Sequence, residues 1–293
     1  MRLPRRRELS PRLVLGGFQL ELQGEAVHPL PARLRPFQTR GGDPQLTCEG
    51  ELGPVAAPGS DGDEILADPG GVWVLHRWGG ELHLTLRLGG PGGKAYQRLS
   101  LGPDLMAARA RLDPSLLQDR PPFALREPLL ELWLSLLLFS GHGLLLHATG
   151  LLTPQGVLAC AGPSGAGKST LAGLFAQAGA GTLLTDDRLI LRPEGEDFRA
   201  WGSPWHGTAG CASPASGRLA GLYVLEKAGR AERLPLGAAE AAMHLAANCF
   251  RGAWPPEGAR HVLETCARLA ERLPCYRLRF TRQPATLAAL GLG

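Results

Sequence analysis

Residues 162–169 read GPSGAGKS and carry the most specific chemical signal in the sequence. They satisfy the pattern G-x-x-x-x-G-K-[ST], in which glycines turn backbone N–H groups toward phosphates, the lysine reaches the β- and γ-phosphates, and the hydroxyl ligates Mg²⁺. An apolar run, residues 157–161, leads into the loop, and an amphipathic segment, residues 168–178, follows it. This strand, loop and helix order predicts a site for ATP and Mg²⁺. The residues expected to contact the nucleotide are Gly162, Pro163, Ser164, Gly165, Ala166, Gly167, Lys168, Ser169 and Thr170.

Two adjacent carboxylates, Asp186 and Asp187, end the next apolar run, residues 182–185. We expect this run to be a strand beside the strand of the phosphate loop, because carboxylates at such strand ends lie on the edge where ligands bind. One aspartate can then hold the metal while the other accepts the proton of an attacking hydroxyl. We expect Asp187 and Ser169 to face the metal and Asp186 to lie nearer the acceptor. The alternative interpretation is that the pair only caps a turn.

The short distance between the loop and the aspartates narrows the class of nucleotide-binding protein. Transporter-type ATPases have a long helical insertion and a signature sequence at this point, and neither is present. An N-K-x-D guanine motif is also missing. The residues therefore favour a kinase that transfers the γ-phosphoryl group of ATP to a hydroxyl, with a small-molecule kinase and a regulatory ATP-binding switch as alternatives.

A histidine upstream of the loop completes a set of motifs that resembles a known family. The run LLLH ending at His147, the loop and the aspartate pair are similar, in order and approximate spacing over about residues 140–230, to the HPr kinase/phosphorylase family. The resemblance implies a P-loop domain of the HPr kinase/PEP carboxykinase-like type that phosphorylates serine on a peptide or small protein. It also implies that His147 orients one of the aspartates. Thr170 stands where the bifunctional members usually have an acidic residue, so the resemblance gives less support to the reverse phosphorylase activity.

The pattern of apolar residues changes near residue 120 and predicts two domains of an α/β protein. Residues 1–120 have short alternating segments typical of an antiparallel β-rich domain, in which the glycine-rich residues 89–93 form a hairpin turn. In residues 121–293 short apolar runs alternate with helical patterns, which predicts helices layered on a largely parallel sheet. The expected strands are 13–22, 72–78, 81–88, 144–148, 157–161, 182–185 and 219–225, and the expected helices are 125–139, 168–178, 236–248 and 257–272.

Composition excludes several other classes of function. The formal charge of +4 comes partly from the basic residues 1–7, which no basic helix follows, so we expect no nucleic-acid partner. Residues 129–139 contain Glu131 and have about half of the ~20 residues that a membrane span needs, so they predict a buried helix. Six scattered cysteines without a C-x-x-C pair favour a reducing cytoplasm over a zinc site or disulfide framework.

Four further features are candidates for contacts with partners. Arg188, Arg218 and Arg251 are candidates to stabilise transferred charge, and His206 lies on a predicted loop where it could reach nucleotide or pack structurally. Three arginines within residues 277–282, which we call the arginine run, could hold an acidic partner or form a solvated strand face. The β-rich domain is expected to bind the acceptor or to mediate assembly into a homo-oligomer.

Overall fold

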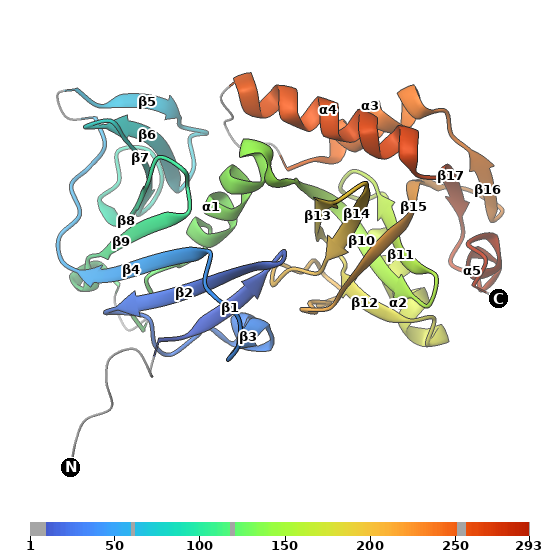
Figure 1. The fold of residues 1–293 in the computed structure, drawn as a ribbon, viewed down its shortest axis with the longest axis horizontal. Coiled ribbons are helices and arrows are strands. Elements are labelled where there is room, and N and C mark those ends of the chain that lie inside the picture. The colour runs from blue at the N-terminus through green and yellow to red at the C-terminus, as the bar shows by residue number, and fades with distance from the viewer. Residues whose placement is uncertain (1–9, 60–61, 118–120, 251–255, 293) are drawn as a thin grey trace, which may run out of the picture. The chain divides into compact units, whose positions relative to one another are not determined.

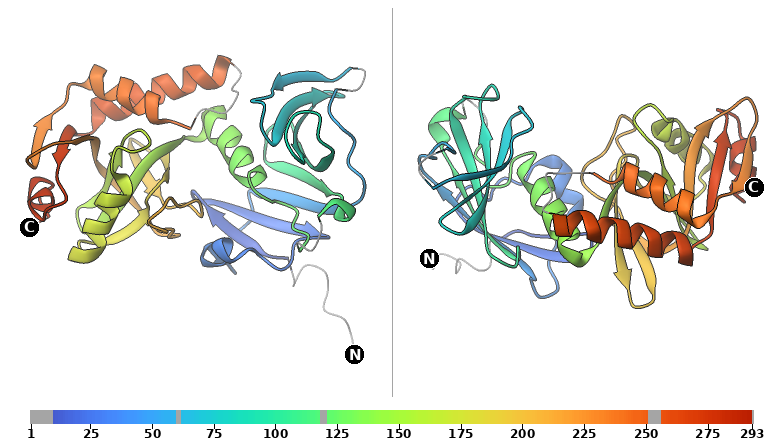
Figure 2. Two further views of the ribbon diagram at one scale, coloured as in Figure 1. Left: turned by 180° about the vertical axis from the view of Figure 1, so that it is seen from behind. Right: turned by 90° about the horizontal axis from the view of Figure 1, so that it is seen from above.

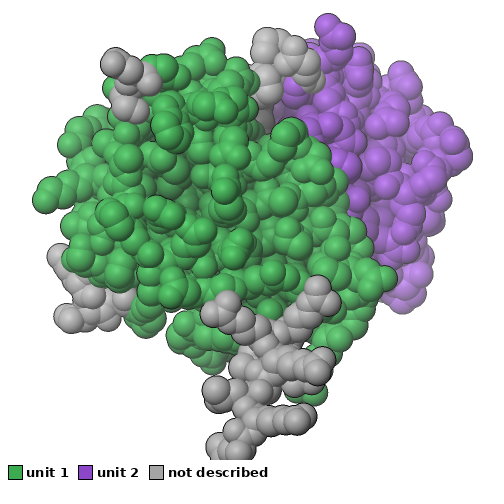
Figure 3. Space-filling model, turned by 60° about the vertical axis from the view of Figure 1, so that its left-hand side comes forward, with its two compact units in different colours: residues 1–14, 18–137 green, residues 15–17, 138–293 purple. Residues whose placement is uncertain are grey.

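The chain divides into two compact units, which Figure 3 shows in different colours. The computed structural model describes residues 10–59, 62–117, 121–250 and 256–292. Unit 1 comprises Met1–Val14 and Phe18–Leu137, and unit 2 comprises Leu15–Gly17 and Leu138–Gly293. The division lies after residue 137 instead of after residue 120, because helix α1 (Leu129–Leu137) packs with unit 1. Its Trp133 donates an indole N–H to the Leu105 carbonyl at 2.8 Å.

Unit 1 is built on one nine-stranded sheet with the order β3-β1-β2-β4-β9-β8-β7-β6-β5 (Figure 1). The strands from β5 to β9 pair with one another in antiparallel register, but β4 pairs in parallel with both β2 and β9. The expected antiparallel domain is therefore a mixed sheet. The strands are β1 (Arg12–Leu15), β2 (Phe18–Gly24), β3 (Gln38–Thr39), β4 (Leu46–Leu52), β5 (Glu64–Ala67), β6 (Trp73–Trp78), β7 (Glu81–Arg87), β8 (Ala95–Leu101) and β9 (Ala107–Leu112), with short 3₁₀ helices η2 (Ala32–Phe37) and η3 (Pro114–Leu116).

The strand β7 is buried on both faces, although its alternating pattern predicts one solvated face. His83 and Thr85, on the polar face, are 2% and 0% exposed. His76 Nε2 lies 2.9 Å from Thr85 Oγ1, and His83 Nδ1 lies 2.9 Å from Ser100 Oγ. Burial lowers the pKa of both histidines, which favours their neutral forms. The hairpin predicted at residues 89–93 is confirmed, because β7 and β8 pair across it.

Unit 2 contains an eight-stranded sheet in which two long strands change partners along their length. β10 pairs first with β13 and then with β11 and β12, and β15 pairs first with β14 and then with β11 and β17. Within the described part of the chain, parallel pairing is confined to β11–β15–β17, so the expectation of a largely parallel sheet is wrong. The strands are β10 (Leu144–Thr153), β11 (Gly156–Ala161), β12 (Thr182–Thr185), β13 (Arg188–Glu194), β14 (Asp197–Trp201), β15 (Ser216–Lys227), β16 (Glu232–Pro235) and β17 (Cys275–Phe280).

Strand β12 occupies a different place from the one expected of it. It was expected beside β11, but Gly150 of β10 pairs with Ala159 of β11 on one side and with Thr185 of β12 on the other. β10 therefore separates the two strands. The reason is that the tight turn at the start of β11 makes β10 its hairpin partner, which leaves the far edge of β10 for β12.

The helices of unit 2 cover both faces of its sheet (Figures 1 and 2). The side chains of Leu171 and Phe175 in α2 pack against Leu158 and Cys160 of β11. Burying each such large apolar side chain stabilises the fold by about 1.5–3 kcal/mol. Figure 1 shows α3 and α4 lying side by side on the opposite side of the strands from α2. The helices are α2 (Lys168–Ala178), α3 (Ala238–Asn248), α4 (Pro256–Arg272) and α5 (Ala285–Ala289), and a π-helical turn, η4 (Leu138–His142), precedes β10.

The most apolar stretch of the sequence forms a buried helix, as its length predicts. In α1, the side chains of Leu129, Leu130, Trp133 and Leu137 are at most 2% exposed. None of the helices in the described ranges of the chain has both the length and the apolar character that crossing a membrane requires.

Candidate active site

The phosphate loop, residues 162–167, joins β11 to α2, as the sequence predicts. Gly165 and Gly167 have φ angles of 78° and 108°, in the region that side chains rarely adopt. A Cβ atom at Gly167 would also lie 2.3 Å from the ring of Phe280, so glycine is needed there for space as well as for backbone conformation. The first backbone N–H groups of α2 have no partner within the helix and are available to an anion.

Replacing Gly167 tests whether this loop conformation is required. We expect Gly167→Ala to lower the free energy of unfolding by about 1–3 kcal/mol, because it strains the backbone and collides with Phe280. Gly173→Ala is the matched control, since Gly173 lies inside α2 with open space around it and should stabilise the protein by about 0.5–1 kcal/mol. Denaturant unfolding measures both. Equal effects of the two substitutions would contradict the expectation.

Lys168 is folded back onto its own loop. Its side chain is 7% exposed, and Nζ donates to the carbonyls of Gly162 at 2.8 Å and Pro163 at 3.0 Å. Burial lowers the pKa of Lys168, while the charges of Asp187 and Asp186 oppose this shift. The ammonium group is therefore held at the loop by two backbone carbonyls, whose place phosphate oxygens could take.

Asp186 is an anchor for a loop that lies far from it in sequence. Its side chain is 1% exposed, and its two oxygens accept hydrogen bonds from the backbone N–H groups of Gly207 at 2.9 Å, Ala209 at 2.8 Å and Cys211 at 3.2 Å. The Ser169 hydroxyl lies 3.5 Å from Asp186 Oδ2. Asp186 therefore joins the loop of residues 207–211 to the first turn of α2.

Asp187 has a different environment from its neighbour. Its Oδ1 lies 2.8 Å from His147 Nε2, and its Oδ2 forms an ion pair with Arg188. Burial alone would raise the pKa of Asp187, but the hydrogen bond from His147 and the charges of Arg188 and Lys168 outweigh it and hold this pKa below its usual range. The Asp187 carboxylate, with 18% of its side chain exposed, remains accessible from the cavity.

An aromatic residue, Phe250, supports the two partners of Asp187. The ring centroids of Phe250 and His147 are 5.4 Å apart, and the guanidinium carbon of Arg188 lies 4.4 Å from the centroid of the Phe250 ring. Cation–π contacts of this kind contribute about 0.5–2 kcal/mol. Nothing local in the sequence indicates this role, because Phe250 follows α3 and reaches β10 only through tertiary pairing.

These groups line a cavity of about 340 Å³, together with most of the other predicted site residues. Gly162, Pro163 and Ala166 belong to the loop but do not line the cavity. No sequence motif marks three of the lining residues, Gly207, Thr208 and Lys227, although Gly207 follows His206 on a predicted loop. The cavity is lined by His147, Ser164, Gly165, Gly167, Lys168, Ser169, Thr170, Asp186, Asp187, Gly207, Thr208 and Lys227.

The oxygen atoms in the cavity fit a magnesium ion. Thr208 Oγ1 donates to Ser169 Oγ at 2.9 Å, and Asp186 Oδ2 lies 3.5 Å from the same hydroxyl. Mg²⁺ prefers such hard oxygen ligands and usually keeps water and phosphate oxygens as its others. Among the described residues, no group of three or more His, Cys, Asp or Glu side chains is arranged to hold a metal. A divalent ion here would therefore depend on the nucleotide for much of its coordination.

The other polar residues singled out in the sequence do not line the cavity, as far as the structure describes them. His206 is exposed beside its own loop, Arg218 is exposed near the start of β15, and Arg251 lies outside the described residues. Within the predicted arginine run, Arg277 pairs with Glu226 and Glu240, and Arg279 pairs with Glu226 and Glu232. Two of the three cations of that run are thus neutralised within unit 2.

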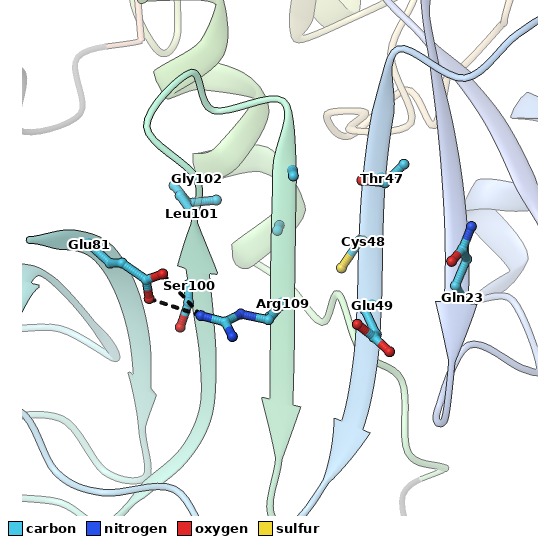
Figure 4. Close-up of a pocket in the computed structure, with 11 residues that line it drawn as sticks. Gln23, Thr47, Cys48, Glu49, Glu81, Ser100, Leu101, Gly102 and Arg109 are labelled. Carbon is cyan, nitrogen blue, oxygen red and sulfur yellow. Dashed lines mark hydrogen bonds and ion pairs between the residues drawn. The ribbon is translucent and has the colours of Figure 1, made fainter. Parts of the chain in front are cut away.

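Unit 1 has a cavity of its own, of about 430 Å³, across strands β2, β4, β9, β8 and β7 (Figure 4). Arg109 Nη2 lies 3.0 Å from Glu81 Oε1, and Figure 4 shows this pair at one side of the cavity and Glu49 on β4 at the other. Burial raises the pKa of the Cys48 thiol, which disfavours the reactive thiolate form. The cavity has polar side chains but no glycine-rich loop among its lining residues.

No family model matches the chain, and no curated protein matches it. The function therefore has to be inferred from the residues around the cavity of unit 2.

Proposed function

We propose that the protein is an ATP-dependent kinase that transfers the γ-phosphoryl group to a hydroxyl, and that the acceptor is a serine of a peptide or small protein. The proposal depends on one observation: a glycine-rich phosphate loop, a buried lysine and two carboxylates in unlike environments line a single cavity. Unit 2 would then be a P-loop domain of the HPr kinase/PEP carboxykinase-like type. Fixed charges and positioned groups supply most of the rate enhancement in phosphoryl transfer, so these residue types are sufficient for the reaction.

Ser169 and Asp186 are best placed to hold Mg²⁺, with Thr208 beside them. Asp186 Oδ2 lies 3.5 Å from the Ser169 hydroxyl, the group that the loop motif assigns to Mg²⁺, whereas the polar contacts of Asp187 are with His147 and Arg188. This assignment reverses the roles expected from the sequence, in which Asp187 was the metal ligand. When bound, Mg²⁺ would neutralise charge on the β- and γ-phosphates.

Asp187 is the better candidate for the base. Each of its oxygens has a second acceptor position, so the carboxylate can take a proton while His147 and Arg188 hold it in place. The hydroxyl oxygen attacks the γ-phosphorus, its proton passes to Asp187, and the bond from the γ-phosphorus to the bridging oxygen breaks with its electrons left on ADP. Lys168 would stabilise the charge that builds up on the phosphates.

The pH dependence of the reaction tests the role of His147. Because the pKa of Asp187 lies below the usual range of an aspartate, the carboxylate stays ionised at lower pH than an ordinary aspartate does. Activity should therefore persist into mildly acidic solution. In His147→Ala the largest lowering influence is lost, so the pKa of Asp187 should rise and the acid limb of the kcat/KM profile should move to higher pH. His206→Ala is the control, because His206 is exposed and outside the cavity. An unmoved acid limb in His147→Ala would show that His147 does not set this pKa.

Transfer of label from ATP tests the function itself. Purified protein is incubated with γ-labelled ATP, Mg²⁺ and, separately, the polypeptide and the small-molecule fractions of its own cytoplasm. We expect label on a serine of a polypeptide. Label only in small metabolites would instead identify a small-molecule kinase. Label released only as free phosphate, at a rate that a partner changes, would identify a regulatory switch.

A further inference from the structure

We propose that Lys227 is a second phosphate-binding cation of the nucleotide site and contacts the phosphate chain of ATP together with Lys168. The inference rests on the proposed binding of ATP and adds a residue that no sequence motif marks. Lys227 is the last residue of β15 and lines the same cavity as the phosphate loop.

The register of the sheet places Lys227 beside the loop. β15 runs parallel to β11, and Ala161, the last residue of β11, pairs with Val224. β15 then continues for three more residues, to Lys227, while the chain after Ala161 enters the phosphate loop. Lys227 is therefore at the carboxyl edge of two neighbouring parallel strands, where ligands of such sheets bind.

The alternation of side chains along β15 turns Lys227 toward the loop. Leu225 lies on the loop side, because its Cβ is 3.4 Å from the position of a Cβ built on Gly162. Side chains two residues apart in a strand share a face, so Lys227 shares the face of Leu225. The neighbouring strand agrees with this placement, because Lys227 pairs in register with Phe280, whose ring packs against Gly167.

The charge of Lys227 is not neutralised by the acidic residue next to it. Glu226 points to the other face of the strand, where it binds Arg277 and Arg279. Within the part of the chain that the structure describes, no hydrogen bond or ion pair is formed by the exposed Lys227 ammonium. A polyanionic ligand bound at the phosphate loop would supply the negative charge that balances Lys227.

Chemical modification of lysines gives a direct test, because the chain has three of them: Lys94, Lys168 and Lys227. The intact protein is reductively methylated with and without Mg-ATP, and each lysine is quantified by mass spectrometry. We expect Mg-ATP to slow modification of Lys227 at least severalfold. Lys94, in the hairpin of unit 1, should react at the same rate in both samples. Equal modification of Lys227 with and without bound Mg-ATP would overturn the proposal.

Substitution provides the second test. Lys227→Ala should raise the Kd for Mg-ATP roughly tenfold, the effect of losing one charged hydrogen bond. Lys227→Arg should restore most of the affinity, and Lys94→Ala should not change it. Wild-type affinity in Lys227→Ala would defeat this inference and leave the proposed kinase intact. Absence of Mg-ATP binding in the wild-type protein would instead defeat the proposed function.

Discussion

The Lys168→Ala protein is expected to show no measurable affinity for Mg-ATP in calorimetry. The substitution removes the ammonium that would contact the β- and γ-phosphates. It also leaves the carbonyls of Gly162 and Pro163 without their donor, so their partial negative charge would repel the phosphates. Both effects act against the same ligand, which makes this the largest loss of binding that we predict.

The fold should survive this change, because the Lys168 side chain bonds only within the loop among the contacts described and takes no part in the apolar core of α2. Thermal unfolding of Lys168→Ala should therefore stay close to that of wild type, and Lys94→Ala should bind Mg-ATP normally. If Lys168→Ala bound Mg-ATP as tightly as wild type, the loop would not be a nucleotide site.

The two aspartates are expected to fail in different ways when each is changed to asparagine. Asp187→Asn should reduce the rate of phosphoryl transfer by about 10²–10⁴-fold, the usual contribution of a base, with little change in nucleotide affinity. Asp186→Asn should mainly destabilise the protein, because one amide oxygen cannot accept from the N–H groups of Gly207, Ala209 and Cys211 as two carboxylate oxygens do. Each buried N–H left without a partner costs about 1–3 kcal/mol.

Single-turnover kinetics and denaturant unfolding, applied to both variants, separate these effects. Asp186→Asn should also require a higher Mg²⁺ concentration for activity than Asp187→Asn. The reverse pattern, with Asp186→Asn slow but stable and Asp187→Asn unstable, would restore the roles expected from the sequence. If both variants transferred the phosphoryl group at the wild-type rate, the two aspartates would only cap a turn.

Local signals predicted two elements of the candidate site well. The bounds of α2 and β12 match the expected residues 168–178 and 182–185. α2 ends at Gly179, which has a φ angle of 58° and donates its N–H to the Ala176 carbonyl at 3.3 Å. This is the left-handed glycine cap that a helix terminus favours, so one residue type was enough to mark the end.

Pairing between distant segments was the part that local patterns could not predict. Alternation within β10 and β15 marks each as a strand but does not show that each changes partners halfway along. For the same reason the roles expected of the aspartates were uncertain. What distinguishes Asp186 from Asp187 is the loop of residues 207–211, about 20 residues away in sequence, which binds Asp186, and His147 on β10, which contacts Asp187. Thr208, Lys227 and Phe250 reach the site through such contacts alone.

The place of β11 between β10 and β15 has a consequence for the order in which the protein acquires its structure. β10 and β11 can form a hairpin early, but Ala161 meets its other partner, Val224, only after the whole segment between them has closed into a loop. Closing long loops slows folding, so we expect this pairing to form late. The stem of the phosphate loop would then reach its native position late in folding, and on the ribosome only after residue 224 has emerged. Nucleotide binding would accordingly report the docking of β15 onto β11, and ligand-dependent protection during refolding would appear only after that step.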